Sequence, residues 1–301
     1  MQSISAGESL LIQGAILALA VISLSLSWWA SQIGSPVVAL FGRWARWFFI
    51  SLLVAGGLYF LAGTGYGIGV LFSISILLWF VLETGYNWLA ISALSRSELP
   101  LFPSFQENEN GEEWPSSKYH IAIKDWLRDA GFKRKQALIS NLEELILMRT
   151  SVYENEEQTI RIHVLFLPNP RGGTSVCFTC YSTTLNGDLI VTDNLFLPFG
   201  GFYPENWDVE RSPWTRSIQK LVQRHHERID AKADSLAPFV MTPLEQINED
   251  QREVEQLNRD LGFLHTHAEE VESGRLTTAG KARIWQEIWT LAYLGIPLKY
   301  N

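Results

Sequence analysis

The first 95 residues are almost entirely apolar, and the spacing of their few polar side chains predicts three membrane-spanning helices. Three runs contain no Asp, Glu, Lys or Arg, and these are residues 10–30, 47–62 and 68–82. A helix needs roughly 20 apolar residues to cross a hydrocarbon core about 30 Å thick. We therefore predict a transmembrane domain over residues 1–96, with helices at about 9–30, 46–63 and 67–88.

Two arginines set the expected orientation of these helices. Arg43 and Arg46 lie between the first two predicted helices, in a loop without acidic residues. Basic loops of this kind face the cytoplasm. The leader Met1–Ser9 contains Glu8 and no Lys or Arg, which favours a retained helix over a cleaved signal peptide. We expect a multi-pass protein of a bacterial-type inner membrane, in contact with membrane lipid, whose C-terminal domain is cytoplasmic.

A glycine-rich turn joins the second and third predicted helices. Its residues Thr64-Gly65-Tyr66-Gly67 resemble the filter loop of potassium channels, which lines a pore with backbone carbonyls. One residue of that pattern is missing, nothing polar follows Gly67, and a fully apolar run of 16 residues precedes the loop. We interpret Gly63, Gly65, Tyr66 and Gly67 as the turn of a membrane hairpin. An oligomeric channel or pore former is retained as an alternative function.

Glu83 directly follows the third apolar run and is the one acidic residue within the third predicted helix. It lies either at the inner membrane interface or within a longer helix that runs to Leu94, where a carboxylate needs a partner. The aromatic neighbours Trp79, Tyr86 and Trp88 favour the interface.

After the membrane segment, the pattern predicts a linker and an α+β domain. Residues 97–116 combine three prolines with five glutamates and show no apolar periodicity, which is typical of an acidic linker. A helix is expected from Ser117 to Gly131, followed by an antiparallel meander of four strands flanked by helices. The predicted strands are residues 145–153, 159–167, 174–184 and 188–197. This domain is predicted to span residues 117–236.

The remaining residues 237–301 predict a small helix-hairpin-helix lobe. A capping box, Thr242-Pro243-Leu244-Glu245, starts a helix that ends at Gly262, and strands 263–266 and 275–277 precede a closing helix over 279–294. This order resembles the second half of a winged-helix domain, whose first helix reads DNA. Residues 243–260 hold six acidic residues against two arginines, so phosphates would repel this helix. The resemblance therefore implies docking to a protein.

Charge is distributed unevenly along the chain. Of 24 basic and 32 acidic residues, three and two lie within residues 1–96, so the remainder carries 21 basic and 30 acidic groups, a net charge of −9. Such a surface repels phosphates, so nucleic acid is excluded as an expected partner. Cys177 and Cys180 are three apart on a predicted strand and point to opposite faces, which argues against a redox or zinc pair.

One histidine pair is a candidate metal site. His265 and His267 are two apart on a predicted strand and so share a face, with Glu269 and Glu270 just beyond. A third ligand is missing at any recognisable spacing. The chain has no G-x-S-x-G, Walker A or dinucleotide-binding motif, and we predict no cofactor. His225 falls within an apolar helical stripe, which is typical of a hydrogen-bonded core histidine.

An aromatic segment is the candidate partner-binding surface. Phe199, Phe202, Tyr203 and Trp207 cluster around two glycines, and exposed aromatics on loops anchor protein interfaces. Alternatively, these rings cap the open end of the meander. The expected function is a non-catalytic anchor, scaffold or regulatory subunit that binds membrane or cytoplasmic proteins and forms an oligomer or complex. The second alternative, after the channel, is a membrane-anchored metal-dependent enzyme at His265 and His267.

Overall fold

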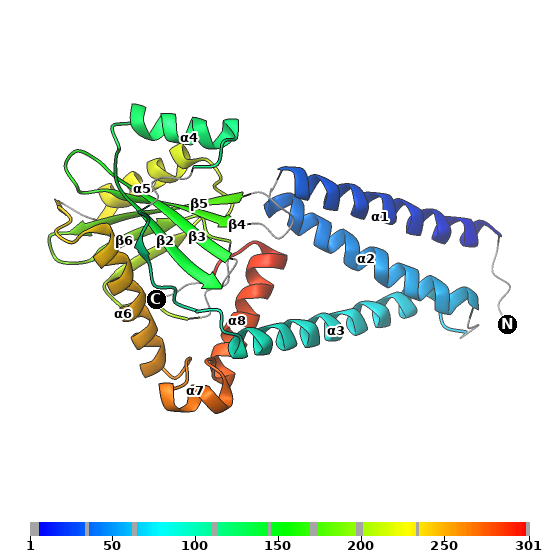
Figure 1. Cartoon of the computed structure of the whole chain (residues 1–301). Coiled ribbons are helices and arrows are strands. Elements are labelled where there is room, and N and C mark those ends of the chain that lie inside the picture. Colours follow the sequence, from blue (N-terminus) through cyan, green and yellow to red (C-terminus); the bar gives the residue numbers. More distant parts are fainter. Residues whose placement is uncertain are drawn as a thin grey trace. The chain divides into compact units, whose positions relative to one another are not determined.

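The chain forms two compact units. A computed structural model describes residues 6–33, 36–61, 65–109, 114–143, 146–168, 174–196, 201–232 and 235–298. The helical unit comprises Met1–Ala93 together with Trp285–Ile296. The sheet unit comprises Leu94–Ile284 together with Pro297–Asn301. Figure 1 shows the elements of both units, coloured along the sequence.

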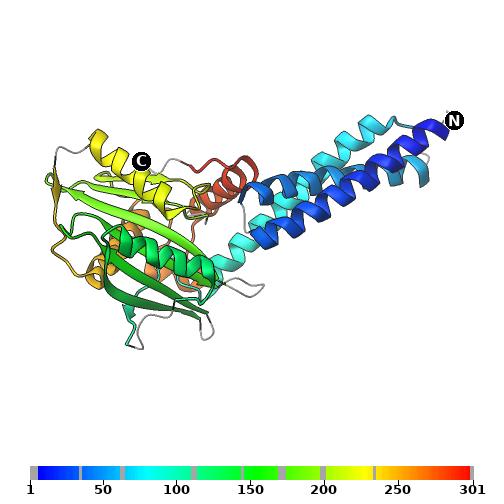
Figure 2. The same ribbon diagram turned by 90° about the horizontal axis from the view of Figure 1, so that it is seen from above.

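The helical unit confirms the three long apolar helices. They are α1 (Ala6–Ile33), α2 (Pro36–Leu61) and α3 (Ile68–Arg96), and each is long and apolar enough to cross a membrane. Figures 1 and 2 show α1 and α2 running alongside each other. Gly56 allows this approach, because a Cβ there would lie 3.1 Å from Ile16 Cδ1. Most large apolar side chains on these helices are exposed, as lipid-facing side chains are, which fits a multi-pass membrane protein.

All three helices extend beyond their predicted bounds, α2 and α3 by the most. Proline at the first position is favourable at a helix start, so α2 begins at Pro36 and includes Arg43 and Arg46, which were expected in a loop. The third helix, α3, continues past Glu83 to Arg96. Tyr293 Oη donates a hydrogen bond of 2.6 Å to Glu83 Oε1. This contact supplies the partner that a carboxylate within a longer helix requires.

The C-terminal part of the helical unit packs on α2. It contains the end of α8 (Thr278–Trp289) and a π-helix, η1 (Thr290–Leu294). Trp44 Nε1 donates to Tyr293 O at 2.8 Å, and the rings of Trp47 and Trp289 are 5.6 Å apart and nearly perpendicular. Aromatic rings spaced by four residues at Trp285, Trp289 and Tyr293 therefore share one helical face and meet the aromatic side chains of α2.

The sheet unit contains an eight-stranded sheet, so the predicted four-stranded meander is wrong. The strand order is β1-β2-β3-β4-β5-β6-β7, with β8 paired to β5, and all pairs are antiparallel except β6 and β7. The strands are β1 (Gln106–Glu107), β2 (Lys133–Glu143), β3 (Ile146–Glu154), β4 (Arg161–Pro168), β5 (Thr174–Thr184), β6 (Leu189–Asp193), β7 (Trp207–Arg211) and β8 (Leu236–Ala237). The predicted strands correspond to β3–β6, whereas the charged strands β2 and β7 lack a continuous apolar pattern.

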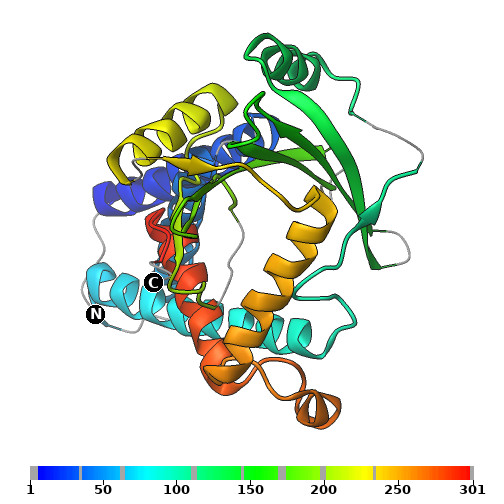
Figure 3. The same cartoon turned by 90° about the vertical axis from the view of Figure 1, so that its left-hand side faces the viewer.

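Helices cover both faces of this sheet. The first face packs against α4 (Lys118–Asp129) and α5 (Ile218–Lys232), with Leu127, Ile162, Phe178 and Leu221 in the core. The second face packs against α6 (Pro243–Asp260), where Ile247 lies against Leu138 and Val152, and Val254 against Trp207. Figure 3 shows α6 on the opposite side of the sheet from α4 and α5.

The segment before the sheet is held by specific contacts. Asn248 pairs with both backbone groups of Phe105, accepting from its N–H at 2.8 Å and donating to its carbonyl at 3.0 Å. Arg275 donates to the carbonyls of Ser97 and Leu99. Residues 97–109 of the predicted linker are thus bound to the sheet unit.

The two strands of the predicted C-terminal hairpin meet at only one bridge, and the acidic turn predicted between them is a helix. Leu264 and Leu276 form a single antiparallel bridge, and α7 (His267–Ser273) lies between them. A capping box between Thr266 and Glu269 starts this helix. The acidic residues expected in a turn therefore occupy helical positions.

Candidate functional site

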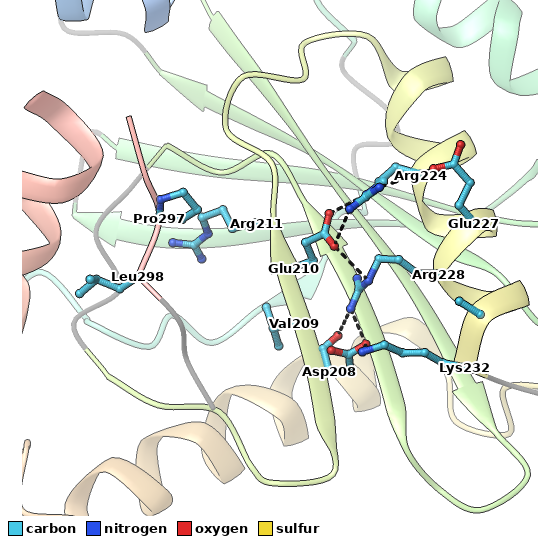
Figure 4. Close-up of a pocket in the computed structure, with 11 residues that line it drawn as sticks. Asp208, Val209, Glu210, Arg211, Arg224, Glu227, Arg228, Lys232, Pro297 and Leu298 are labelled. Atoms are coloured by element: carbon cyan, nitrogen blue, oxygen red, sulfur yellow. Dashed lines mark hydrogen bonds and ion pairs between the residues drawn. The ribbon is translucent and has the colours of Figure 1, made fainter. Parts of the chain in front are cut away.

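A hollow of about 550 Å³ lies beside β7 and α5 in the sheet unit, and we call it the β7 hollow. Its lining combines charged and apolar side chains (Figure 4). The lining residues are Asp208, Val209, Glu210, Arg211, Arg224, Glu227, Arg228, Ala231, Lys232, Pro297 and Leu298.

Helical and strand periodicity bring opposite charges together at this hollow. Arg224, Arg228 and Lys232 are spaced by four residues along α5 and therefore share one face. Asp208 and Glu210 alternate along β7 and point toward α5 (Figure 4). Arg224 Nε lies 2.8 Å from Glu210 Oε1, Arg228 Nη2 lies 2.7 Å from Asp208 Oδ2, and Lys232 Nζ lies 2.5 Å from the same oxygen.

These contacts keep both carboxylates of β7 ionised at neutral pH. Burial raises the pKa of Asp208, but hydrogen bonds and charges from Lys232 and Arg228 outweigh it and lower the pKa below its ordinary value. Burial likewise raises the pKa of Glu210, and Arg224 and Arg228 reverse the effect. The described lining contains no Ser, Thr, Cys or His that could act as a nucleophile. The arrangement presents paired charges on one strand and one helix, where the polar groups of a ligand can contact them.

A directed chain of hydrogen bonds joins α5 to β5 and β6 behind the hollow. Arg228 donates to Thr192 Oγ1 at 2.6 Å, and Thr192 Oγ1 lies 2.8 Å from His225 Nδ1. On the other side, His225 Nε2 lies 3.0 Å from Ser182 Oγ, whose proton goes to the carbonyl of Thr159. These partners require a neutral imidazole protonated at Nε2. Burial lowers the pKa of His225 to about 3, and the expectation of a hydrogen-bonded core histidine is confirmed.

The aromatic segment lies at the start of β7 and packs inward. Phe199 lies outside the described residues. Trp207 is buried, and Tyr203 stacks on it with ring centroids 5.6 Å apart. Phe202 contacts the ring of Phe263 at 5.3 Å and also lies under the guanidinium of Arg283. The three described rings thus contribute to the packing of the sheet unit, and their role in partner binding stays a prediction.

The two candidate metal ligands face different carboxylates. His265 precedes α7 and His267 is its first residue, so they do not share a strand face as expected. His265 Nδ1 lies 3.5 Å from Glu269, and His267 Nδ1 lies 3.7 Å from Glu270. Over the residues that the structure describes, no group of three or more His, Cys, Asp or Glu side chains could hold a metal ion.

The described residues of the glycine turn directly precede α3. Gly63 lies outside the described residues, Gly65 adopts a φ of +72°, and Tyr66 is 62% exposed. The carbonyl of Gly67 accepts hydrogen bonds from the backbone N–H groups of Val70 and Leu71. This carbonyl is thereby engaged within the chain as the first turn of the helix.

Sequence reasoning missed the β7 hollow. Its signal was present in two places, as basic residues four apart in α5 and as alternating acids in residues 207–211. Neither segment shows by itself that the two meet, because this depends on the parallel pairing of β7 with β6. Comparisons of the chain with protein-family models, with characterised proteins and with solved structures find no match. The fold alone shows three helices that are long and apolar enough to cross a membrane, and a second unit built on a mixed sheet.

Proposed function

We propose that this protein is a non-catalytic membrane-anchored component that binds protein partners through its sheet unit. The β7 hollow carries this proposal, because it combines ion-paired side chains and an apolar lining on one strand and one helix. Three apolar helices support the anchor, since each can cross a membrane. The class of protein is thus an anchor, scaffold or regulatory subunit within an oligomer or a larger complex.

The sheet unit is proposed to face the cytoplasm of a cell whose membrane holds the three helices. Arg43 and Arg46, at the first part of α2, support this orientation because basic residues flanking spans remain on the cytoplasmic side. The net charge of −9 on the residues after position 96 supports protein partners over anionic lipid surfaces and nucleic acid.

Crosslinking in intact membranes tests this function. The full chain is crosslinked, extracted in mild detergent and analysed for covalent adducts of defined composition. We expect adducts with one or a few proteins, which are lost in Arg224→Glu together with Lys232→Glu. The matched control is Lys220→Glu, an exposed substitution on α5 outside the hollow. A chain that is recovered only as an uncrosslinked monomer contradicts the proposal.

A further inference from the structure

The strand β7 lies at one edge of the sheet, next to β6. Some of its backbone N–H and C=O groups point away from β6. In a parallel pair, one residue directs both its N–H and C=O toward the neighbouring strand, and the next directs both away. Leu189 N donates to Asn206 O at 2.8 Å, and Ser212 N donates to Asp193 O at 2.7 Å. This register turns the backbone groups of Asp208 and Glu210 toward β6. Those of Val209 therefore point outward.

The β7 hollow adjoins this outer edge. Among the strands that the structure describes, none pairs with the outer side of β7. Val209, at the centre of the strand, lines the hollow together with Pro297 and Leu298 (Figure 4). An unpaired edge is a template for another strand, and natural proteins commonly cover or twist such edges. Here the edge borders a cavity that an inserted side chain can fill.

The charge of the hollow differs from that of the domain around it. Four cations and three carboxylates line it, and one of the cations, Arg211, pairs with the buried Asp193 at 3.0 Å. The hollow is therefore close to neutral, whereas residues 97–301 together carry −9. The side chains of Arg224 and Lys232 are 52% and 51% exposed, so both remain accessible to a ligand. An acidic group therefore meets two exposed cations here and net repulsion over most of the remaining surface.

We propose that an extended acidic segment of a partner protein adds as a strand to the outer edge of β7 and inserts side chains into the β7 hollow. This inference rests on the proposed function and specifies its chemistry. Backbone hydrogen bonds to Val209 supply affinity, and side chains supply specificity. Because neighbouring residues of a strand face opposite sides, one residue lies beside the cations of α5 and the next beside Val209, Pro297 and Leu298. The recognised pattern is therefore an alternation of acidic and apolar residues.

Defined peptides test this pattern on the full chain in lipid nanodiscs. The probe is a fluorescent nine-residue peptide of alternating Glu and Val, compared with peptides that replace Glu by Lys, Val by Ser, or the central residue by Pro. We expect the Glu-Val peptide to bind at least about tenfold more tightly than each of the others, equivalent to about 1.4 kcal/mol. Equal binding of the Lys-Val peptide, or no binding of the Glu-Val peptide, overturns the proposal.

A variant of the edge separates backbone pairing from general attraction. Val209→Pro removes an outward N–H while leaving the bonds to β6, a position where edge strands tolerate proline. We expect at least about a tenfold loss of binding, with Val209→Ile unchanged as the matched control. Hydrogen exchange on the unaltered chain gives a second readout, because the bound peptide should slow exchange of the Val209 amide. An unchanged exchange rate at saturating peptide contradicts strand addition even where Val209→Pro does not fold.

The outcomes distinguish this inference from the proposed function. Crosslinked partners that persist in Val209→Pro leave the partner-binding function standing and overturn strand addition. Absence of any crosslinked partner, with the peptide still bound, overturns the function in the membrane and leaves the edge as a peptide site. Oligomerisation that Val209→Pro abolishes identifies a second copy of the chain as the occupant and overturns a separate partner.

Discussion

Asp250 lies in α6, and its pKa is raised, whereas carboxylates paired with a cation usually have a lowered pKa. Burial first, and then the charge of Glu253, raise its pKa to about 7 against the opposing charge of Arg161. Between pH 3.8 and about pH 7, the native state keeps the proton of Asp250, whereas the unfolded chain releases it. Stability is therefore lost as the pH rises through this interval.

Replacement of this acid by an amide should stabilise the protein in a pH-dependent way. In Asp250→Asn no proton is lost, so its stability relative to the unaltered chain should grow between pH 4 and pH 8 by up to about 4 kcal/mol. Thermal unfolding of the full chain in detergent at both pH values measures the difference. Asp260→Asn, an exposed change on the same helix, should have no such effect. An Asp250→Asn difference that is constant with pH contradicts the prediction.

Two buried histidines have similar pKa values but different surroundings. Burial lowers the pKa of both His163 and His225 to about 3. Each folded pKa lies below the unfolded value of 6.5, so the unfolded state binds more protons between these values and stability falls as the pH drops. His225 has hydrogen-bond partners on both ring nitrogens, whereas Nε2 of His163 has none among the described residues.

The two histidines should therefore respond oppositely to replacement by phenylalanine. His163→Phe removes an unsatisfied polar atom and should leave stability at pH 7 unchanged or increased. His225→Phe leaves Ser182 and Thr192 without their partner and should cost about 1–3 kcal/mol. At pH 5 the His163→Phe variant should gain roughly a further 2 kcal/mol over the unaltered chain. Chemical denaturation at both pH values checks this, and equal losses for the two variants would refute it.

The hydrogen bond between Tyr293 and Glu83 joins two elements, η1 and α3. Tyr293→Phe leaves the carboxylate without this donor and should lower the stability of the helical unit by about 1–3 kcal/mol. Glu83→Gln retains an acceptor and should cost less. The double variant should lose less than the sum of the two, because both changes affect one interaction. Thermal unfolding in lipid nanodiscs measures all four proteins, and strict additivity would show that the pair is uncoupled.

Gly274 ends α7 and lies against Ser95, at the end of α3, within the sheet unit. Its φ is +81°, and a Cβ would lie 2.8 Å from Ser95 Oγ and 3.0 Å from Ser95 O. Gly262 has a similar φ of +77° but open space around it. Gly274→Ala should therefore cost more than Gly262→Ala, whose effect should be about 1–2 kcal/mol from backbone strain alone. Thermal unfolding compares the two variants, and equal shifts would mean that the contact with Ser95 is easily relaxed.

Elements with strong local patterns were predictable from the sequence, and elements defined by distant partners were not. The long apolar runs predict α1, α2 and α3, and strict alternation predicts β4, where Ile162, Val164 and Phe166 face one core. The charged strand β7 resembles a loop because its five residues WDVER include three charges. Its extended conformation depends on β6, beside it in the sheet, and on ion pairs to α5.

The same limit applies to the site at the scale of the whole molecule. The β7 hollow combines residues 208–211 with residues 224–232 and 297–298. Periodicity shows which face each segment presents, but it does not show which faces meet. The aromatic cluster was conversely visible in sequence, yet Trp207 is buried, because an apolar ring beside a strand is as suited to a core as to an interface.

The proposed orientation of the whole chain leads to a further prediction. Arg46 is exposed on α2, so its replacement changes charge without removing a buried contact. Protease added outside spheroplasts should leave residues 97–301 intact in the unaltered chain. In Arg46→Glu, one of two basic determinants is reversed and a fraction of molecules should become cleavable. Arg46→Lys is the matched control, and cleavage of the unaltered chain would place the sheet unit outside.

Trp285–Ile296 belong to the same compact unit as the first 93 residues. On the ribosome, the three apolar helices emerge long before the tryptophans and Tyr293 that pack against α2. The three helices therefore lack their contacts with residues 285–296 while nearly two hundred intervening residues are translated. A chain that ends before Trp285 should consequently be destabilised in the segment that is made first.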